Sequence, residues 1–177
     1  MLIYSQQCNS LIQTACNRIS RLAAFAELIK FIGTLAENND TKLKQCVLYF
    51  IELACEYSFD EDIMKNFASQ LSVLFEKYLG DEEMIIKVCA IKAVTAFLAN
   101  IEDKVFLKNF APILPILVKT LIQAVKTEEE SGRATIESII DLMEFHPKFV
   151  KPIAEDLISI FVDIIDAPSL GDGTISL

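Results

Sequence analysis

The chain has 177 residues, the length of a single domain, and 53% of them are apolar, which is enough to bury a sizeable core. Its 16 basic and 25 acidic residues give a net charge of −9, which argues against nucleic acid as a partner and favours a basic protein or peptide. Five cysteines without a C-x-x-C spacing indicate reduced thiols, and with one histidine they predict no metal site; no other cofactor is expected.

Neither a membrane span nor a signal peptide is expected. The longest uncharged, strongly apolar run is Asn109–Val118, and a bilayer crossing needs roughly 20 residues. The first residues contain no basic leader, and glutamine and asparagine interrupt them. A glycine-rich phosphate loop and an H-E-x-x-H motif are both missing, so we expect no enzymatic activity.

The strongest pattern is a repeat with a 43-residue period, seen first in Leu28, Leu71, Leu114 and Leu157. Three further apolar columns keep this interval: Phe31, Leu74, Leu117 and Ile160; then Ile32, Phe75, Val118 and Phe161; then Leu35, Tyr78, Leu121 and Ile164. A period in the low forties with helical patterning is typical of HEAT repeats. We therefore predict an all-α, armadillo-like solenoid, a right-handed superhelix of antiparallel helix pairs.

The first pairs are predicted as follows, with the outer helix of each pair called A and the inner one B. A B-like helix is expected over about 3–19, and an A helix over about 20–38. Thr41 is expected to cap a B helix that reaches Tyr57. Ser58 and Glu61 have the spacing of a capping box that opens the next A helix.

The second A helix is predicted to end at Gly80 in a left-handed conformation, after which Asp81 caps a B helix reaching about Asn100. The third A helix, Val105–Lys126, must bend because Pro112 and Pro115 each lack a backbone donor.

Thr127 and Glu130 have capping-box spacing and are predicted to open a B helix that ends at Phe145, before Pro147. A last A helix is predicted over about Phe149–Asp166. The chain 1–177 is thus interpreted as one solenoid segment with units at about 1–19, 20–58, 59–102, 103–146 and 147–177. The first and last are half units, so we expect a piece of a longer array.

Three stretches of sequence carry a resemblance to a known family: Ala90–Asn100, Phe106–Pro115 and Glu137–Pro152. In this order and spacing they resemble the N-terminal region of the importin-beta (karyopherin-beta) family of nuclear transport receptors, in its importin five or karyopherin beta three branch. The segment His146–Pro152 and the closing Pro168-Ser169-Leu170 are the most branch-specific parts.

The resemblance implies a receptor that carries protein cargo through the nuclear pore and works in the cytoplasm, the nucleus and the pore. It implies release of cargo when Ran-GTP binds the full-length parent. It also implies contacts between the outer helices and phenylalanine-glycine repeats of nucleoporins. The alternative is a HEAT scaffold or regulatory subunit of another complex, such as a phosphatase subunit or an assembly adaptor.

One set of acidic residues on predicted B helices is a candidate surface for a lysine-rich cargo signal: Glu52, Glu56, Glu137, Asp141 and Glu144. The last three stand at i, i+4 and i+7 and share one helix face. Each exposed contact would contribute at most about 1 kcal/mol. The alternative interpretation is a solvated helix face.

Phe67 and Phe110 occupy the same repeat position near the start of successive A helices. They are candidate aromatic positions between A helices, where the family binds phenylalanine side chains. The alternative is packing, because aromatic residues at helical spacing usually fill a core.

Overall fold

The computed structural model describes residue 27 and residues 30–35, 37–57, 61–127 and 129–166. The predicted helix 3–19 and most of the predicted helix 20–38 lie outside these ranges, so the division into units remains a prediction. All regular structure in the described ranges is helical, which confirms the predicted all-α class. The named helices are α3 (Thr41–Tyr57), α4 (Glu61–Leu79), α5 (Met84–Ala99), α6 (Lys104–Leu107), the 3-10 helix η1 (Lys108–Phe110), α7 (Ile113–Thr127), α8 (Glu129–Phe145), α9 (Pro147–Val150), the 3-10 helix η2 (Lys151–Ile153) and α10 (Ala154–Asp166).

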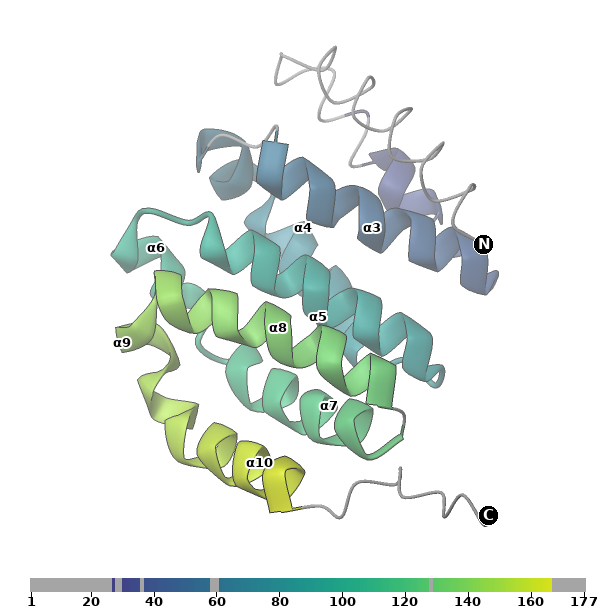
Figure 1. Cartoon of the computed structure of the whole chain (residues 1–177). Helices are drawn as coiled ribbons and strands as arrows, with labels where there is room; N and C mark the ends of the chain where they lie inside the picture. The colour runs from purple at the N-terminus through teal and green to yellow at the C-terminus, as the bar shows by residue number, and fades with distance from the viewer. Residues whose placement is uncertain (1–26, 28–29, 36, 58–60, 128, 167–177) are drawn as a thin grey trace, which may run out of the picture.

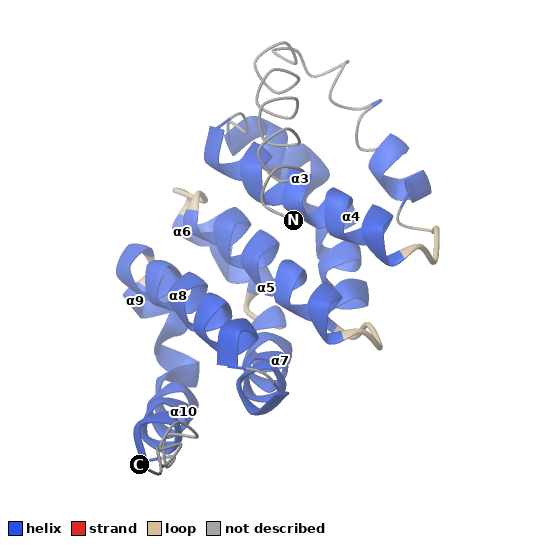
Figure 2. Ribbon diagram, turned by 45° about the vertical axis from the view of Figure 1, so that its right-hand side comes forward, coloured by secondary structure: helices blue, strands red, loops and turns tan. Residues whose placement is uncertain are grey.

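The helices form two layers, which are visible in Figures 1 and 2. The B layer consists of α3, α5 and α8, and α5 packs between the other two. In the A layer, α7 contacts both α4 and α10. The layers are joined because α4 and α7 pack on α5, and α7 also packs on α8. This arrangement, in which A and B helices alternate along the chain and form two layers, is that of the predicted solenoid. In such a fold each helix pair buries its apolar face against its neighbours.

The repeat columns supply the core between the layers. Leu71, Leu114 and Leu157 are all at most 2% exposed, whereas Leu28 lies outside the described residues. Between α4 and α5, the rings of Phe75 and Phe97 lie 5.5 Å apart at a tilt of 58°. Such tilted contacts add to the stabilisation that burial of the rings provides.

Proline residues break two of the A helices at turns that lie 43 residues apart, whereas α4 is continuous. The segments before and after Pro112, Lys104–Phe110 and Ile113–Thr127, meet at an angle of 58°, which confirms the predicted bend. The predicted final helix Phe149–Asp166 is also broken, because the chain passes through α9 and η2 before α10 begins. Pro152 lacks a backbone donor there and accounts for this second break.

No single helix in the described ranges is long and apolar enough to cross a bilayer. The bent pair of Lys104–Phe110 and Ile113–Thr127 reaches that length and composition only when taken together.

The helix caps predicted at Thr41 and Thr127 are wrong. The Asp40 carboxylate, rather than Thr41, accepts from the backbone N–H of Lys42 at 2.8 Å and so caps α3. The Thr127 hydroxyl donates to the carbonyl of Gln123 at 2.7 Å, so it belongs to the end of α7 and does not open α8. Serine, threonine and aspartate side chains bond equally well to several nearby backbone groups, and the spacing alone does not choose among them.

The turn between α4 and α5 also differs from its prediction. Gly80 does not adopt a positive φ, so α4 does not end in a left-handed glycine. The N-cap of α5 is Glu83, which makes no side-chain cap hydrogen bond. Asp81 instead accepts from the backbone N–H of Glu83 at 3.0 Å and stabilises the turn.

Gly132 permits the close approach of α8 to α7. A Cβ atom at this position would lie 3.0 Å from the Cα atom of Val125. Glycine inside a helix costs about 1 kcal/mol relative to alanine. Here the missing side chain lets the backbones of the two helices of one unit approach each other closely.

Tyr78 is the polar member of an otherwise aliphatic repeat column. Its side chain is fully buried, and its hydroxyl has no hydrogen-bond partner among the described residues. Burial, with a smaller contribution from Asp81, raises the pKa of Tyr78 to about 12, so the phenol stays neutral. The ring fills a core position, while its hydroxyl carries a desolvation cost.

Polar side chains tie consecutive units together at the same end of the B helices. The Nζ atom of Lys44 on α3 lies 2.7 Å from a carboxylate oxygen of Asp81, and the two side chains are 13% and 8% exposed. Forty-three residues later, Lys87 on α5 donates to Gln123 at 3.0 Å. Equivalent lysines thus contact the next A helix or the turn that follows it, but only the first contact is an ion pair.

Because of this ion pair, the effect of Asp81→Asn on the free energy of unfolding should depend on pH. Burial by itself would raise the pKa of Asp81, but hydrogen bonds from Lys44 and from the Glu83 N–H more than offset this and lower it below its ordinary 3.8. The ionised carboxylate therefore stabilises the fold at neutral pH, and this contribution is lost as the pH falls through the lowered pKa. We expect the variant to lose about 1–3 kcal/mol of unfolding free energy at pH 7, measured by urea denaturation.

The exposed Glu76→Gln change on α4 serves as the control and should leave the free energy of unfolding nearly unchanged. Below the pKa, wild type and Asp81→Asn should become equally stable. A stability difference that stays the same from neutral pH to strongly acidic pH would contradict the ionic role of Asp81.

Candidate functional site

The B layer presents one face that no described helix covers. On α8, Glu137, Asp141 and Glu144 are all exposed and follow one another at i, i+4 and i+7. The intervening Ile139 and Leu142 are fully buried, so the helix has a distinct core face. We call Glu137, Asp141 and Glu144 the acidic stripe.

The acidic stripe is confined to α8. Helix α5 starts 45 residues before α8, and at the equivalent positions it carries Lys92, Ala96 and Ala99. All three are half-buried. At these positions the open face of the B layer thus carries one basic and two apolar residues on α5, and three acidic residues on α8.

Glu52 does not join the acidic stripe. It is half-buried on α3, and α5 lies between α3 and α8. Its charge acts on Cys89 of α5: burial raises the pKa of this thiol to about 11, Glu52 adds to the increase, and Lys92 opposes it. The side chain of Glu56 lies outside the described ones. Of the five acidic candidates, the structure brings together the three on α8.

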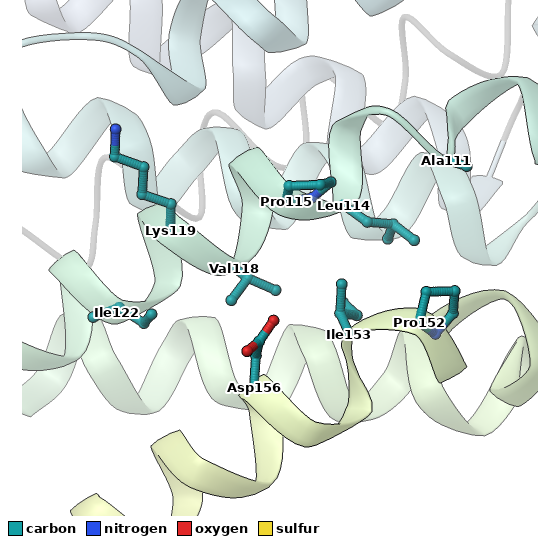
Figure 3. Close-up of a pocket in the computed structure, with 9 residues that line it drawn as sticks. All are labelled: Ala111, Leu114, Pro115, Val118, Lys119, Ile122, Pro152, Ile153 and Asp156. Carbon is teal, nitrogen blue, oxygen red and sulfur yellow. The ribbon is translucent and has the colours of Figure 1, made fainter.

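A second candidate surface is a groove in the A layer, between α7 and the η2–α10 segment, drawn in Figure 3. Its volume is about 450 Å³. The lining is mostly apolar and consists of Ala111, Leu114, Pro115, Val118, Lys119, Ile122, Pro152, Ile153 and Asp156. We call it the outer groove. Apolar concave sites with a few polar groups are the usual form of binding sites for apolar ligands.

The proline breaks shape this groove. The turns η1 and η2 are 43 residues apart and precede α7 and α10 at equivalent positions. Each turn redirects its A helix, and exposed Pro115 and Pro152 line opposite walls of the groove. Pro115 is the third residue of α7, where the missing N–H has no partner inside the helix.

The two phenylalanines singled out in the sequence do not line the outer groove. Phe110 is 4% exposed, and its ring contacts Phe97 at 5.1 Å and Phe106 at 5.4 Å. Phe67 is half-buried and packs on the core. The sequence did not reveal the residues that line the outer groove, because their repeat columns look like core columns. Only the prolines indicated where the helices break.

His146 has a structural contact at the turn between α8 and α9. Its Nε2 atom lies 3.2 Å from the carbonyl oxygen of Ala99, which fits a tautomer with the proton on Nε2. This contact joins the ends of two stacked B helices. In the part of the chain that the structure describes, no group of three histidine, cysteine or acidic side chains could hold a metal ion.

The two-layered stack of helix pairs defines a helical-repeat protein. The chain matches the family described as IPO5-like, TPR repeats, over residues 10–160. This match covers most of the chain, and the chain belongs to that family. Neither the comparison with curated proteins nor the comparison with solved structures found a match.

The helix pairs have the dimensions of HEAT repeats, although the family description speaks of TPR repeats. TPR units recur at about 34 residues, whereas HEAT and armadillo units recur at about 40–47. The 43-residue interval of Leu71, Leu114 and Leu157 falls in the second range.

Proposed function

We propose that this chain is a segment of a nuclear transport receptor that carries protein cargo. The family match supports this proposal together with one structural observation, the apolar outer groove between consecutive A helices. The groove would bind phenylalanine-glycine segments of nucleoporins, and the B layer would bind cargo. No catalytic chemistry is proposed for either surface.

The outer groove suits a single aromatic side chain. Its walls are formed by aliphatic and proline side chains, including Val118 and Ile153, which are 6% and 5% exposed and give it a firm base. Pro115 and Pro152 present their rings from opposite walls. A phenylalanine gains from burial of a large apolar surface, while the glycine beside it lets the peptide backbone come close to the rim.

A charge on the wall of the groove should prevent this binding. Pro115→Asp places a carboxylate there, and aspartate in the first turn of a helix is compatible with the fold of α7. We expect the affinity for a phenylalanine-glycine peptide to fall about tenfold, or about 1.4 kcal/mol, in fluorescence anisotropy titrations.

Val73→Asp is the matched control, because Val73 is 69% exposed on another A helix and does not line the groove. It introduces the same charge and should leave the affinity unchanged. Equal binding by wild type and Pro115→Asp would exclude the outer groove as the binding site.

The acidic stripe supports binding of a basic cargo signal. Its three carboxylates are exposed on one helix of the B layer, and the chain as a whole carries a net charge of −9. Complementary charge accelerates association and selects among partners more than it adds affinity. A lysine-rich segment lying along α8 would contact all three side chains.

Charge reversal of the acidic stripe, with lysine at positions 137, 141 and 144, should weaken binding of a basic cargo peptide at least about tenfold at low salt. The control reverses three exposed acids elsewhere, at positions Glu76, Glu82 and Glu102, and changes the net charge equally. Isothermal titration of both variants separates the stripe from the overall charge. If both variants lose the same affinity, the stripe is a solvated surface and not a cargo site.

Control by Ran is proposed for the full-length parent, in which binding of Ran-GTP would release cargo. We expect the parent to bind both Ran-GTP and phenylalanine-glycine repeats in pull-down assays, and a fluorescent fusion to accumulate at the nuclear rim. Binding to neither partner would overturn the transport function and favour a HEAT scaffold of another complex.

A further inference from the structure

We propose that Asp156 makes the outer groove selective for a peptide in which a basic residue stands next to the bound apolar side chain. The inference rests on the proposed peptide-binding function of the groove and adds the chemistry that the groove prefers. The partner is an extended segment that pairs a large apolar side chain with a lysine or arginine.

Asp156 is the single acidic residue in the lining of the groove. It lies in the first turn of α10, and Figure 3 shows its carboxylate directed toward Val118 and the space above Ile153. In the described part of the molecule, no lysine or arginine lies within ion-pair distance of this exposed carboxylate. An apolar ligand would therefore fill the groove beside a negative charge that has no cation of its own.

A filled groove strengthens the preference of Asp156 for a cation. When an apolar side chain covers Val118 and Ile153, it removes water from one side of the carboxylate and lowers the local dielectric constant. A cationic residue next to that side chain compensates the lost hydration with a charge-assisted contact. An acidic residue at the same place is repelled, and a neutral one leaves the carboxylate partly desolvated.

Lys119 on the opposite wall gives the groove a direction. It is exposed on α7, and in Figure 3 its ammonium group points away from the space that Asp156 faces. A basic residue of the ligand is thus attracted toward α10 and repelled from α7. The two opposite charges favour one orientation of a peptide that crosses the groove.

The test compares two neutralising variants, Asp156→Asn and Glu155→Gln. Glu155 is also exposed in the first turn of α10, but it does not line the groove, so both changes alter the net charge and the helix terminus alike. Three peptides with one phenylalanine-glycine core are used, flanked by lysine, serine or glutamate. Their affinities are measured by fluorescence anisotropy at low and at high salt.

For wild type, we expect the lysine peptide to bind about fivefold more tightly than the glutamate peptide at low salt, and this ratio should shrink at high salt. Asp156→Asn should bring the ratio close to one, while the serine peptide binds at least as tightly as it does to wild type, because no carboxylate is desolvated. Glu155→Gln should keep the wild-type ratio. Lys119→Gln should strengthen binding of the lysine peptide.

The failures of the two proposals are distinguishable. If wild type binds all three peptides equally, the selectivity is overturned and peptide binding by the groove stands. If Glu155→Gln lowers the ratio as much as Asp156→Asn does, the preference arises from overall charge, and the role of Asp156 is overturned. If the serine peptide does not bind wild type, the groove itself is not the site.

Discussion

The structure depends on the constraint that no helix pair in this chain can bury its apolar face alone. Helix α5 shows this best, because it is covered by α3 and α8 on two sides and by A helices on a third. Ile91, Val94 and Phe97 are fully buried as a result, on a helix that is apolar over most of its circumference. Stability in such an array adds up from one interface to the next, and the stack remains deformable along its length.

Both candidate surfaces follow from this arrangement. The B helices stack side by side, so one face of α8 remains open, and the acidic stripe lies there. Two A helices are interrupted at equivalent turns, and the outer groove forms where α7 meets the η2–α10 segment. The acidic stripe is suited to a basic partner, whereas the outer groove is mostly apolar and suited to an apolar side chain.

The interfaces between units are also unequal. Lys44 and Asp81 join α3 to the turn before α5 through a nearly buried ion pair, whereas the more exposed pair of Lys65 and Asp103, 3.0 Å apart, lies between the next two units. One unit later, the equivalent of the first contact is the neutral pair of Lys87 and Gln123. The outer groove lies farther toward the C-terminal end of the array, beside α10. The buried ion pair and the outer groove therefore lie in different parts of the array.

The sequence by itself determined the helical class, the 43-residue period, the bend at Pro112 and the shared face of Glu137, Asp141 and Glu144, because periodicity and missing backbone donors act locally. It misplaced the caps at Thr41 and Thr127, since a short polar side chain chooses among several backbone groups only in the folded chain. The half-burial of Glu52, the burial of Phe110 and the groove around Asp156 were decided by tertiary structure alone. Each depends on how two helices distant in sequence approach one another, and a repeat pattern specifies which columns recur but not which side chains the packing leaves open.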